Sequence, residues 1–258
     1  MSRAMPIEAS TLLAPRKERA AWRQMLRVLS RNKLVLAGVA IAAVMLFAAI
    51  FAGFIAPYDP IAQKVSDSLH SPSLQYWFGT DRFGRDVLSR TIYGSRISMW
   101  VGFASVSLAV SVGTLLGLVS GYFGGWIDNV ISRIMDVFFS FPAMLLAIAI
   151  AAMLGPGMNN ALLAIAIVYS PLFSRVVRGP VLAERNKEYI EAARVLGASN
   201  RRVVGLHVLP NVLSPIIVQG SVTLSHAILM ESYVSFLGLG TQPPEASWGS
   251  MLNEGRAF

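Results

Sequence analysis

The sequence predicts an all-α protein that crosses a membrane several times as a polytopic bundle of helices. Hydrophobic residues make up 54% of its 258 residues and charged residues only 14%, whereas soluble domains carry about 25% charged residues. The mean hydropathy of +0.56 agrees with this imbalance. A membrane helix needs about 20 mostly apolar residues. The candidate spans are residues 34–56, 97–122, 137–154, 161–173 and 212–230.

The first candidate span, residues 34–56, contains no polar side chain, and Pro57 and Asp59 end it. A cleavable signal peptide is the alternative, but its apolar region is about 7–15 residues long. We therefore predict a retained span between an N-terminal segment, residues 1–33, and a loop, residues 57–96.

The remaining spans follow from composition and turn signals. Residues 97–122 are rich in Gly and Ser, which let membrane helices pack closely. Residues 137–174 carry no charge but are too long for one helix, and the segment GPGMNN at 155–160 predicts a turn that divides them. The fifth span, residues 212–230, is more polar than the others.

Basic residues predict the orientation, because Lys and Arg accumulate at the cytoplasmic ends of spans. Residues 1–33 hold eight Lys and Arg against two Glu, and residues 174–211 hold seven against three. We therefore expect both segments in the cytoplasm, and the loop 57–96 and the tail 231–258 outside. The loop 57–96 is also basic, but four Asp balance its charge and the rule weakens in long loops. The net charge of +8 thus reflects topology, and we expect membrane lipid but no nucleic acid as a partner.

Several kinds of chemistry are missing from the sequence. There is no cysteine, which excludes disulfides, thiolate nucleophiles and Cys-based metal sites. No GxxxxGK[ST] segment is present to cradle a nucleotide, and neither HExxH nor GxSxG occurs. We expect no catalytic residue, no metal and no cofactor on this chain.

A short amphipathic helix is predicted in the cytoplasmic segment between the fourth and fifth spans. Residues 187–196 are good helix formers, and Gly197 stands where a helix end favours positive φ. Glu188 and Glu191 suit the start of the helix. Residues at helical spacing give it a continuous face: Tyr189, Ala192, Ala193 and Leu196. Such a helix can dock on a partner protein, lie on the lipid surface or simply close a loop, and its residues alone do not choose among these roles.

The same segment resembles the EAA motif of bacterial ABC importer permeases. Glu191-Ala192-Ala193 is followed after three residues by Gly197 and, at the end of the spacing, by Leu209-Pro210. His207 stands where the motif usually has Ile. In that family the motif helix docks in a cleft of the ATPase subunit. The resemblance therefore implies these ATPase-coupling residues: Tyr189, Glu191, Ala192, Ala193, Gly197, Leu209 and Pro210.

Other stretches resemble the dipeptide and oligopeptide branch of the same family. These are residues 77–90 with 94–98, residues 121–142 and residues 235–256, and their order is similar to that of the second, C-type permease. The resemblance implies a type I ABC importer permease in the bacterial inner membrane that carries short peptides. It implies as partners two copies or homologues of an ATPase that bind ATP and Mg, a second homologous permease and a periplasmic substrate-binding protein.

Alternative functions remain at this point. The same branch imports glutathione and nickel complexes. An ion-driven secondary transporter would need charged coupling residues inside its spans, which are almost absent here. A signalling or structural membrane protein should carry a soluble output domain, and none is visible.

Two further expectations concern particular residues. The family has a sixth span, which is missing from the sequence up to Phe258, so that five spans are visible; a truncated sequence and a defective product are the two explanations. In the long loop, Asp81, Arg82, Arg85 and Asp86 are expected to form exposed local ion pairs that order the loop, and a contact with substrate is the alternative. Arg133 and Asp136, at the start of the third span, are expected to have a pairing role rather than a transport role.

Overall fold

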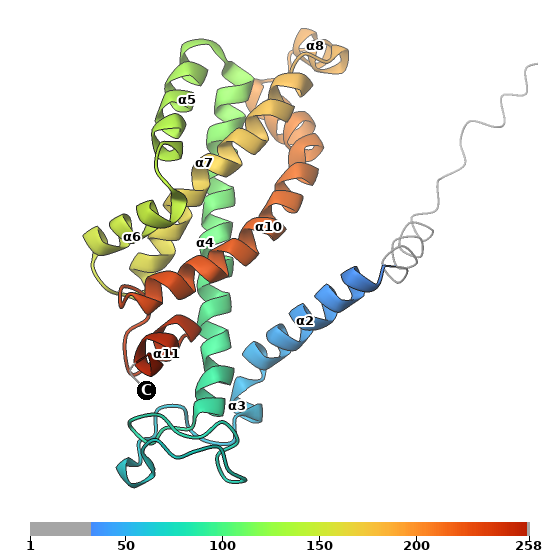
Figure 1. The fold of residues 1–258 in the computed structure, drawn as a ribbon. Helices are drawn as coiled ribbons and strands as arrows, with labels where there is room; N and C mark the ends of the chain where they lie inside the picture. The colour runs from blue at the N-terminus through green and yellow to red at the C-terminus, as the bar shows by residue number, and fades with distance from the viewer. Residues whose placement is uncertain (1–31, 257–258) are drawn as a thin grey trace, which may run out of the picture. The chain divides into compact units, whose positions relative to one another are not determined.

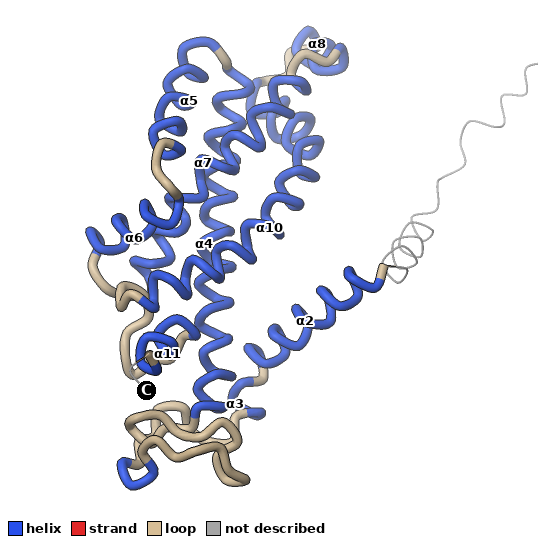
Figure 2. Tube along the Cα trace, viewed as in Figure 1, coloured by secondary structure: helices blue, strands red, loops and turns tan. Residues whose placement is uncertain are grey.

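The protein is seen in a computed structural model that describes residues 32–256. It divides into two units, Met1–Leu46 and Phe47–Phe258. The described residues are helical and contain no named strand, and Figure 2 shows only helices joined by loops. The basic residues before Asn32, on which much of the predicted orientation depends, lie outside the described part.

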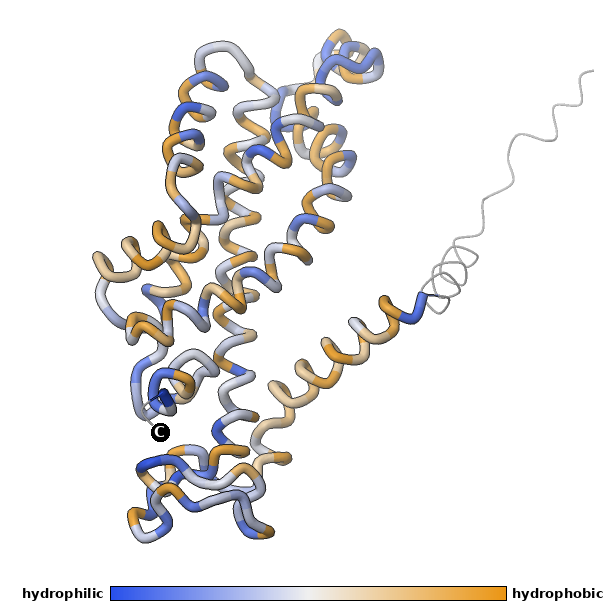
Figure 3. The backbone as a smooth tube through the Cα atoms, viewed as in Figure 1, coloured by the Kyte–Doolittle hydropathy of each residue, from blue (hydrophilic) through white to orange (hydrophobic). Residues whose placement is uncertain are grey.

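The first long helix is α2 (Lys33–Ile50), followed by the short α3 (Ala52–Ile55). After Lys33, α2 is made of apolar residues and glycine, and its tube in Figure 3 carries apolar colours over this run. The loop that follows contains one turn of 3-10 helix, Val65–Asp67, and ends at Asp86.

Four helical segments in the described residues are long and apolar enough to cross a membrane. They are α2, α4 (Val87–Phe123), α7 (Met158–Glu184) and the continuous run Asn200–Phe236. A fifth candidate is the pair α5 (Gly125–Phe139) and α6 (Ala143–Leu154), if the two helices form one broken span.

The predicted third span, residues 137–154, covers the end of α5 and all of α6. The chain bends by 93° between α5 and α6, and the apolar residues before the bend belong to α5. Pro142 is the cause, because proline has no backbone N–H to donate and disfavours helical geometry at the preceding residue, Phe141. Pro142 stands at the N-cap of α6.

The helices also run beyond the apolar stretches that predicted them. α4 begins at Val87 rather than near residue 97, and α7 continues through Pro171 and Pro180 to Glu184. Hydropathy marks only the apolar part of a helix, whereas backbone hydrogen bonding continues into polar sequence. The predicted loop 174–211 is therefore mostly helical.

The last run of helix has three parts. α9 (Asn200–Val203) passes through a π-helical turn, Val204–Val208, into α10 (Leu209–Phe236). A final helix, α11 (Trp248–Gly255), lies in the predicted tail 231–258, and Ser247 caps it by accepting a hydrogen bond from Ser250 N.

The centre of the second unit is the contact between α4 and α7. Gly113, Gly117 and Gly121 of α4 face α7 so closely that a Cβ at Gly117 would lie 2.6 Å from the Ser174 carbonyl oxygen. Val101, Ile165 and Phe173 are buried in the adjoining core. The small residues of the second span thus serve close helix packing, as predicted.

Beyond this contact, the structure places a buried cluster of charges where exposed ion pairs were expected. Arg85 Nε lies 2.6 Å from Asp81, and Arg85 Nη2 lies 2.6 Å from Glu254 of α11. Arg90 Nη2 contacts the same Glu254 oxygen at 3.0 Å. The expected local pair between Asp81 and Arg85 forms, but it is buried rather than exposed, because Arg85 is only 2% exposed. The neighbouring Arg90 is 1% exposed. Their distant partner, Glu254, covers them.

The two other acidic residues of these expectations have different partners. Asp86 does not join the cluster but caps α4, where it accepts a hydrogen bond from Ser89 N at 2.8 Å. Asp136 has the expected pairing role, and its partner is Arg175 of α7 at 3.0 Å.

Candidate functional site

The predicted amphipathic helix is present as α8 (Glu188–Val195). Lys187 is its N-cap residue, and Glu188 and Glu191 occupy the first turn. Gly197 has a φ of 84°, a conformation that a Cβ disfavours. The amide of Ala198 donates to Ala193 O at 3.0 Å and that of Gly197 to Arg194 O at 2.9 Å. This pair of bonds is a Schellman motif, so the helix ends where the glycine predicted.

One apolar side chain anchors α8 to the long helices. Ile190 is fully buried in a cluster that contains Val181 of α7, Val203 of α9 and Val212 of α10. Figure 1 shows α8 beyond the end of α7 and beside the start of the α9–α10 run. The helical spacing of Tyr189, Ala192, Ala193 and Leu196 did not reveal this anchor, because Ile190 lies between those positions.

A polar network holds the start of α8. The Tyr189 hydroxyl donates to one carboxylate oxygen of Glu184. The other oxygen of this carboxylate lies 2.7 Å from Lys187 Nζ. Asn211 Nδ2 donates to the Tyr189 hydroxyl oxygen at 3.2 Å and to His207 O at 2.7 Å. The hydrogen bond to Glu184, with some burial, raises the pKa of Tyr189 above its usual 10.0.

The outer side of α8 is exposed. Glu188, Glu191 and Ala192 face outward, and Ala193 is half-buried. Val195 and Leu196, at the tip of the helix, are 87% and 86% exposed. The predicted ATPase-coupling residues include neither Val195 nor Leu196, although both stand directly before Gly197, which ends the helix. Val195 and Leu196 thus form a small apolar surface at the end of α8.

Leu209 and Pro210, the end of the motif spacing, are not on α8. They form the first turn of α10, directly after the π-helical turn, where Leu209 packs against the buried cluster and Pro210 is exposed. Asn211, next in the chain, makes the contact with Tyr189 described above. The motif therefore combines α8 with the first turn of α10. His207 is half-buried between them, and its ring centroid lies 6.2 Å from that of Tyr189.

Ion pairs also connect α5 to α7 near this site. Arg178 of α7 donates from Nε and Nη2 to Asp128 of α5, both at 2.5 Å. Arg185, directly after α7, donates from Nη1 to the carbonyl oxygen of Gly121 in α4 at 2.9 Å. Across residues 32–256, no three His, Asp or Glu side chains gather as metal ligands would.

Comparison with known proteins identifies the family. Residues 113–258 match the model of the binding-protein-dependent transport system inner membrane component. The chain belongs to this family. It is thus a multi-pass protein of the inner membrane, and residues 21–72 also match the N-terminal membrane domain of oligopeptide transport permease C.

Similar permeases have curated names. The chain is 47% identical, over 92% of its length and 78% of the relative, to the dipeptide transport system permease protein DppC of Alkalihalophilus pseudofirmus. It is 42% identical, over 97% of its length and 83% of the relative, to the glutathione transport system permease protein GsiD of Escherichia coli.

The fold of the permease has a solved counterpart. Inward-facing structures of the MetNI methionine ABC transporter match it with TM-scores of 0.51 and 0.52, over 58% and 64% of this chain and 75% and 85% of that one. Their sequence identities of 21% and 20% limit this likeness to the fold. The predicted all-α, type I importer architecture is confirmed.

Proposed function

We propose that this permease carries short peptides inward across the inner membrane, driven by ATP hydrolysis on separate ATPase subunits. α8 supports the proposal most directly, because it is fixed from behind by Ile190 and presents Val195 and Leu196 outward. The N-terminus and α8 lie in the cytoplasm in this proposal. ATP and Mg bind to the partner subunits, and this chain supplies no catalytic residue or cofactor.

The transporter in this proposal contains two ATPase subunits, a second homologous permease and a periplasmic binding protein that delivers substrate. ATP binding draws the two ATPase subunits together, and each carries a docked helix with it. Because α8 is joined to α7 and to the start of α10, its displacement tilts both helices. Alternating access then follows from a bistable bundle whose equilibrium the nucleotide biases.

Two substitutions test the docking site. Glu191→Lys reverses a charge on the exposed side of α8, and Gly197→Asp places a side chain on a left-handed residue. We expect both to abolish peptide uptake while the chain still inserts into the membrane. Glu245→Lys, on the opposite side of the bundle, is the matched charge control and should transport normally. Normal uptake in both α8 variants would remove the docking proposal.

Crosslinking gives a direct measurement of the same contact. Because the chain contains no cysteine, Ala192→Cys introduces a unique thiol on the exposed side of α8. In native membranes it should capture an ATPase subunit with a short bifunctional reagent, and Ser66→Cys should not.

Uptake measurements on the whole transporter with its binding protein distinguish between the candidate substrates. The DppC relative favours a dipeptide, and the GsiD relatives support glutathione as the second candidate. If excess glutathione does not reduce the uptake of a labelled dipeptide, the dipeptide is supported as the substrate. Transport that collapses with an ionophore but persists without ATP would indicate an ion-driven carrier instead.

A further inference from the structure

The loop between α3 and α4 carries an apolar wall whose role the transport function does not explain. Leu74, Trp77 and Phe78 are 98%, 69% and 56% exposed. With Ile55 of α3 and with Leu88 and Ile92 of α4 they line a recess of about 530 Å³. Exposed apolar surface of this kind marks a binding surface for protein or membrane.

The wall is held in place by the loop's own hydrogen bonds. Tyr58 N donates to Ser89 Oγ of α4 at 3.0 Å, and the Tyr58 hydroxyl donates to Gln75 O at 3.1 Å. The buried Tyr76 donates its hydroxyl to Asp67 at 2.7 Å, which lowers the pKa of that carboxyl. Tyr76 therefore points into the loop while its neighbours point out, so their exposure is a fixed feature of the fold.

The position of the wall along the helices matches the surface layer of a membrane. A Cβ on Gly53 would lie 3.5 Å from the Tyr93 hydroxyl, so the end of the first apolar run is close to Tyr93. Leu88 is five residues further out on α4, or about 7.5 Å at the α-helical rise. The headgroup layer on each side of the hydrocarbon core is about 5–7 Å thick. Taking the end of the apolar run near Gly53 as the edge of the hydrocarbon core, the recess extends from Ile92 near this edge to Leu88 at about the outer limit of the headgroup layer.

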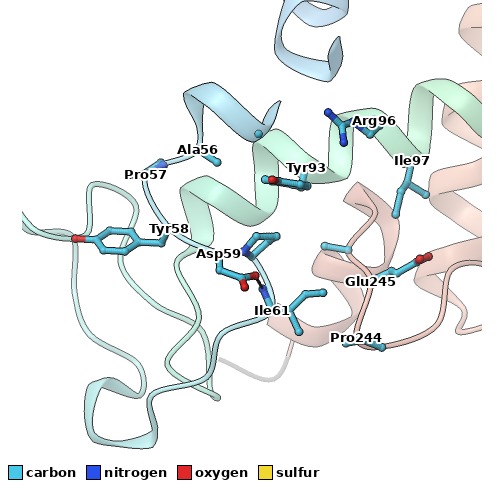
Figure 4. Close-up of a pocket in the computed structure, with 13 residues that line it drawn as sticks. Ala56, Pro57, Tyr58, Asp59, Ile61, Tyr93, Arg96, Ile97, Pro244 and Glu245 are labelled. Carbon is cyan, nitrogen blue, oxygen red and sulfur yellow. Dashed lines mark hydrogen bonds between the residues drawn. The ribbon is translucent and has the colours of Figure 1, made fainter. Parts of the chain in front are cut away.

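A neighbouring recess shows the contrast. Figure 4 shows a cavity of about 680 Å³ lined by the chain from Ala56 to Ile61, by Tyr93, Arg96 and Ile97, and by Pro244–Ala246. Its lining includes charged groups that already have partners: Arg96 donates to the carbonyls of Ala49 and Ile50, and Asp59 accepts from Ile61 N. The wall around Trp77 has no charged lining residue.

We propose that Leu74, Trp77 and Phe78 bind phospholipid at the membrane surface, with the recess taking the glycerol and upper acyl region of a lipid. Tryptophan is enriched at this depth because its ring is apolar and its N–H is polar. The wall is also continuous with Ile55, which follows the first apolar helix, and with Ile92 of α4, a helix apolar enough to span the membrane. The loop is then a surface anchor that fixes the start of α4, and this holds whichever solute is carried.

Spin labels on the cysteine-free chain test the proposal. The whole transporter carrying Leu74→Cys is labelled and placed in nanodiscs of phosphatidylethanolamine and phosphatidylglycerol. Collision with oxygen, which concentrates in lipid, is compared with collision with a water-soluble nickel chelate. Ser66→Cys, in the polar part of the loop, and Val39→Cys, in the first apolar run, are the aqueous and lipid references.

We expect the Leu74 label to prefer oxygen over nickel at least several-fold more than the Ser66 label does, approaching the Val39 label. Phe78→Cys gives a second position and should agree. A Leu74 label as accessible to nickel as the Ser66 label would overturn the proposal. If it then became protected only when the binding protein is added, the wall would be a protein-docking surface instead. If the unsubstituted transporter takes up no peptide while the Leu74 label still prefers oxygen, the proposed function fails and the lipid contact stands.

Discussion

The two ends of the second unit hold their outermost helices by different means. At one end, α11 is attached through charges: Glu254 contacts Arg85 and Arg90, both almost fully buried. At the other end, α8 is attached through one buried apolar side chain, Ile190, and a partly exposed network around Tyr189. Removing one partner of a buried ion pair greatly lowers the free energy of unfolding. A helix fixed by one side chain, in contrast, keeps most of its surface available for another protein.

The largest effect is expected from Glu254→Ala. Two buried guanidinium groups would lose a carboxylate, and removing one partner of a buried pair costs about 3–5 kcal/mol of unfolding free energy. Thermal unfolding of the purified transporter measures this cost. Arg175→Met breaks the exposed pair with Asp136 and should cost only about 0–1 kcal/mol. Equal losses of unfolding free energy in the two variants would show that burial does not make one ion pair more stabilising than the other.

An intermediate effect is expected from Ile190→Ala, which removes the anchor of α8. Truncating a buried Ile costs about 2–5 kcal/mol, and here the loss should fall on the attachment of α8. Protease cleavage near residues 185–199 should accelerate, and copurification with ATPase should decrease. Val195→Ala, on the exposed tip, is the control: it should weaken ATPase binding without changing cleavage. Unchanged cleavage in Ile190→Ala would contradict the single-anchor description.

The smallest effect is expected from Tyr189→Phe, which removes the hydrogen bond to Glu184. Such a bond contributes about 0.5–1.5 kcal/mol, and the partial exposure of Tyr189 places it at the lower end. The folded state raises the pKa of Tyr189, so its contribution is present below the usual value of 10.0 and is lost as the pH rises through the raised value. The difference between wild type and variant, followed by protease cleavage, should therefore vanish in strong alkali. A constant difference at all pH values would assign it to packing.

Much of the fold was predictable from local patterns. Apolar runs located α2, α4, α7 and α10, because hydrophobicity is a property of the segment itself. Gly197 marked the end of α8, because glycine readily adopts the left-handed backbone conformation found there. The EAA spacing predicted the segment that forms α8. The ATPase-coupling role of its residues remains a prediction that the structure alone does not test.

The sequence by itself thus determined which segments are helical, which of them suit a membrane and where the exposed helix α8 ends. Only the tertiary structure decided that α5 and α6 meet at 93°, that Ile190 anchors α8, and that Glu254 pairs with Arg85, 169 positions earlier. The physical reason is range. Helix formation depends on neighbours within a few residues, whereas the partner of a buried charge is chosen by how the helices pack.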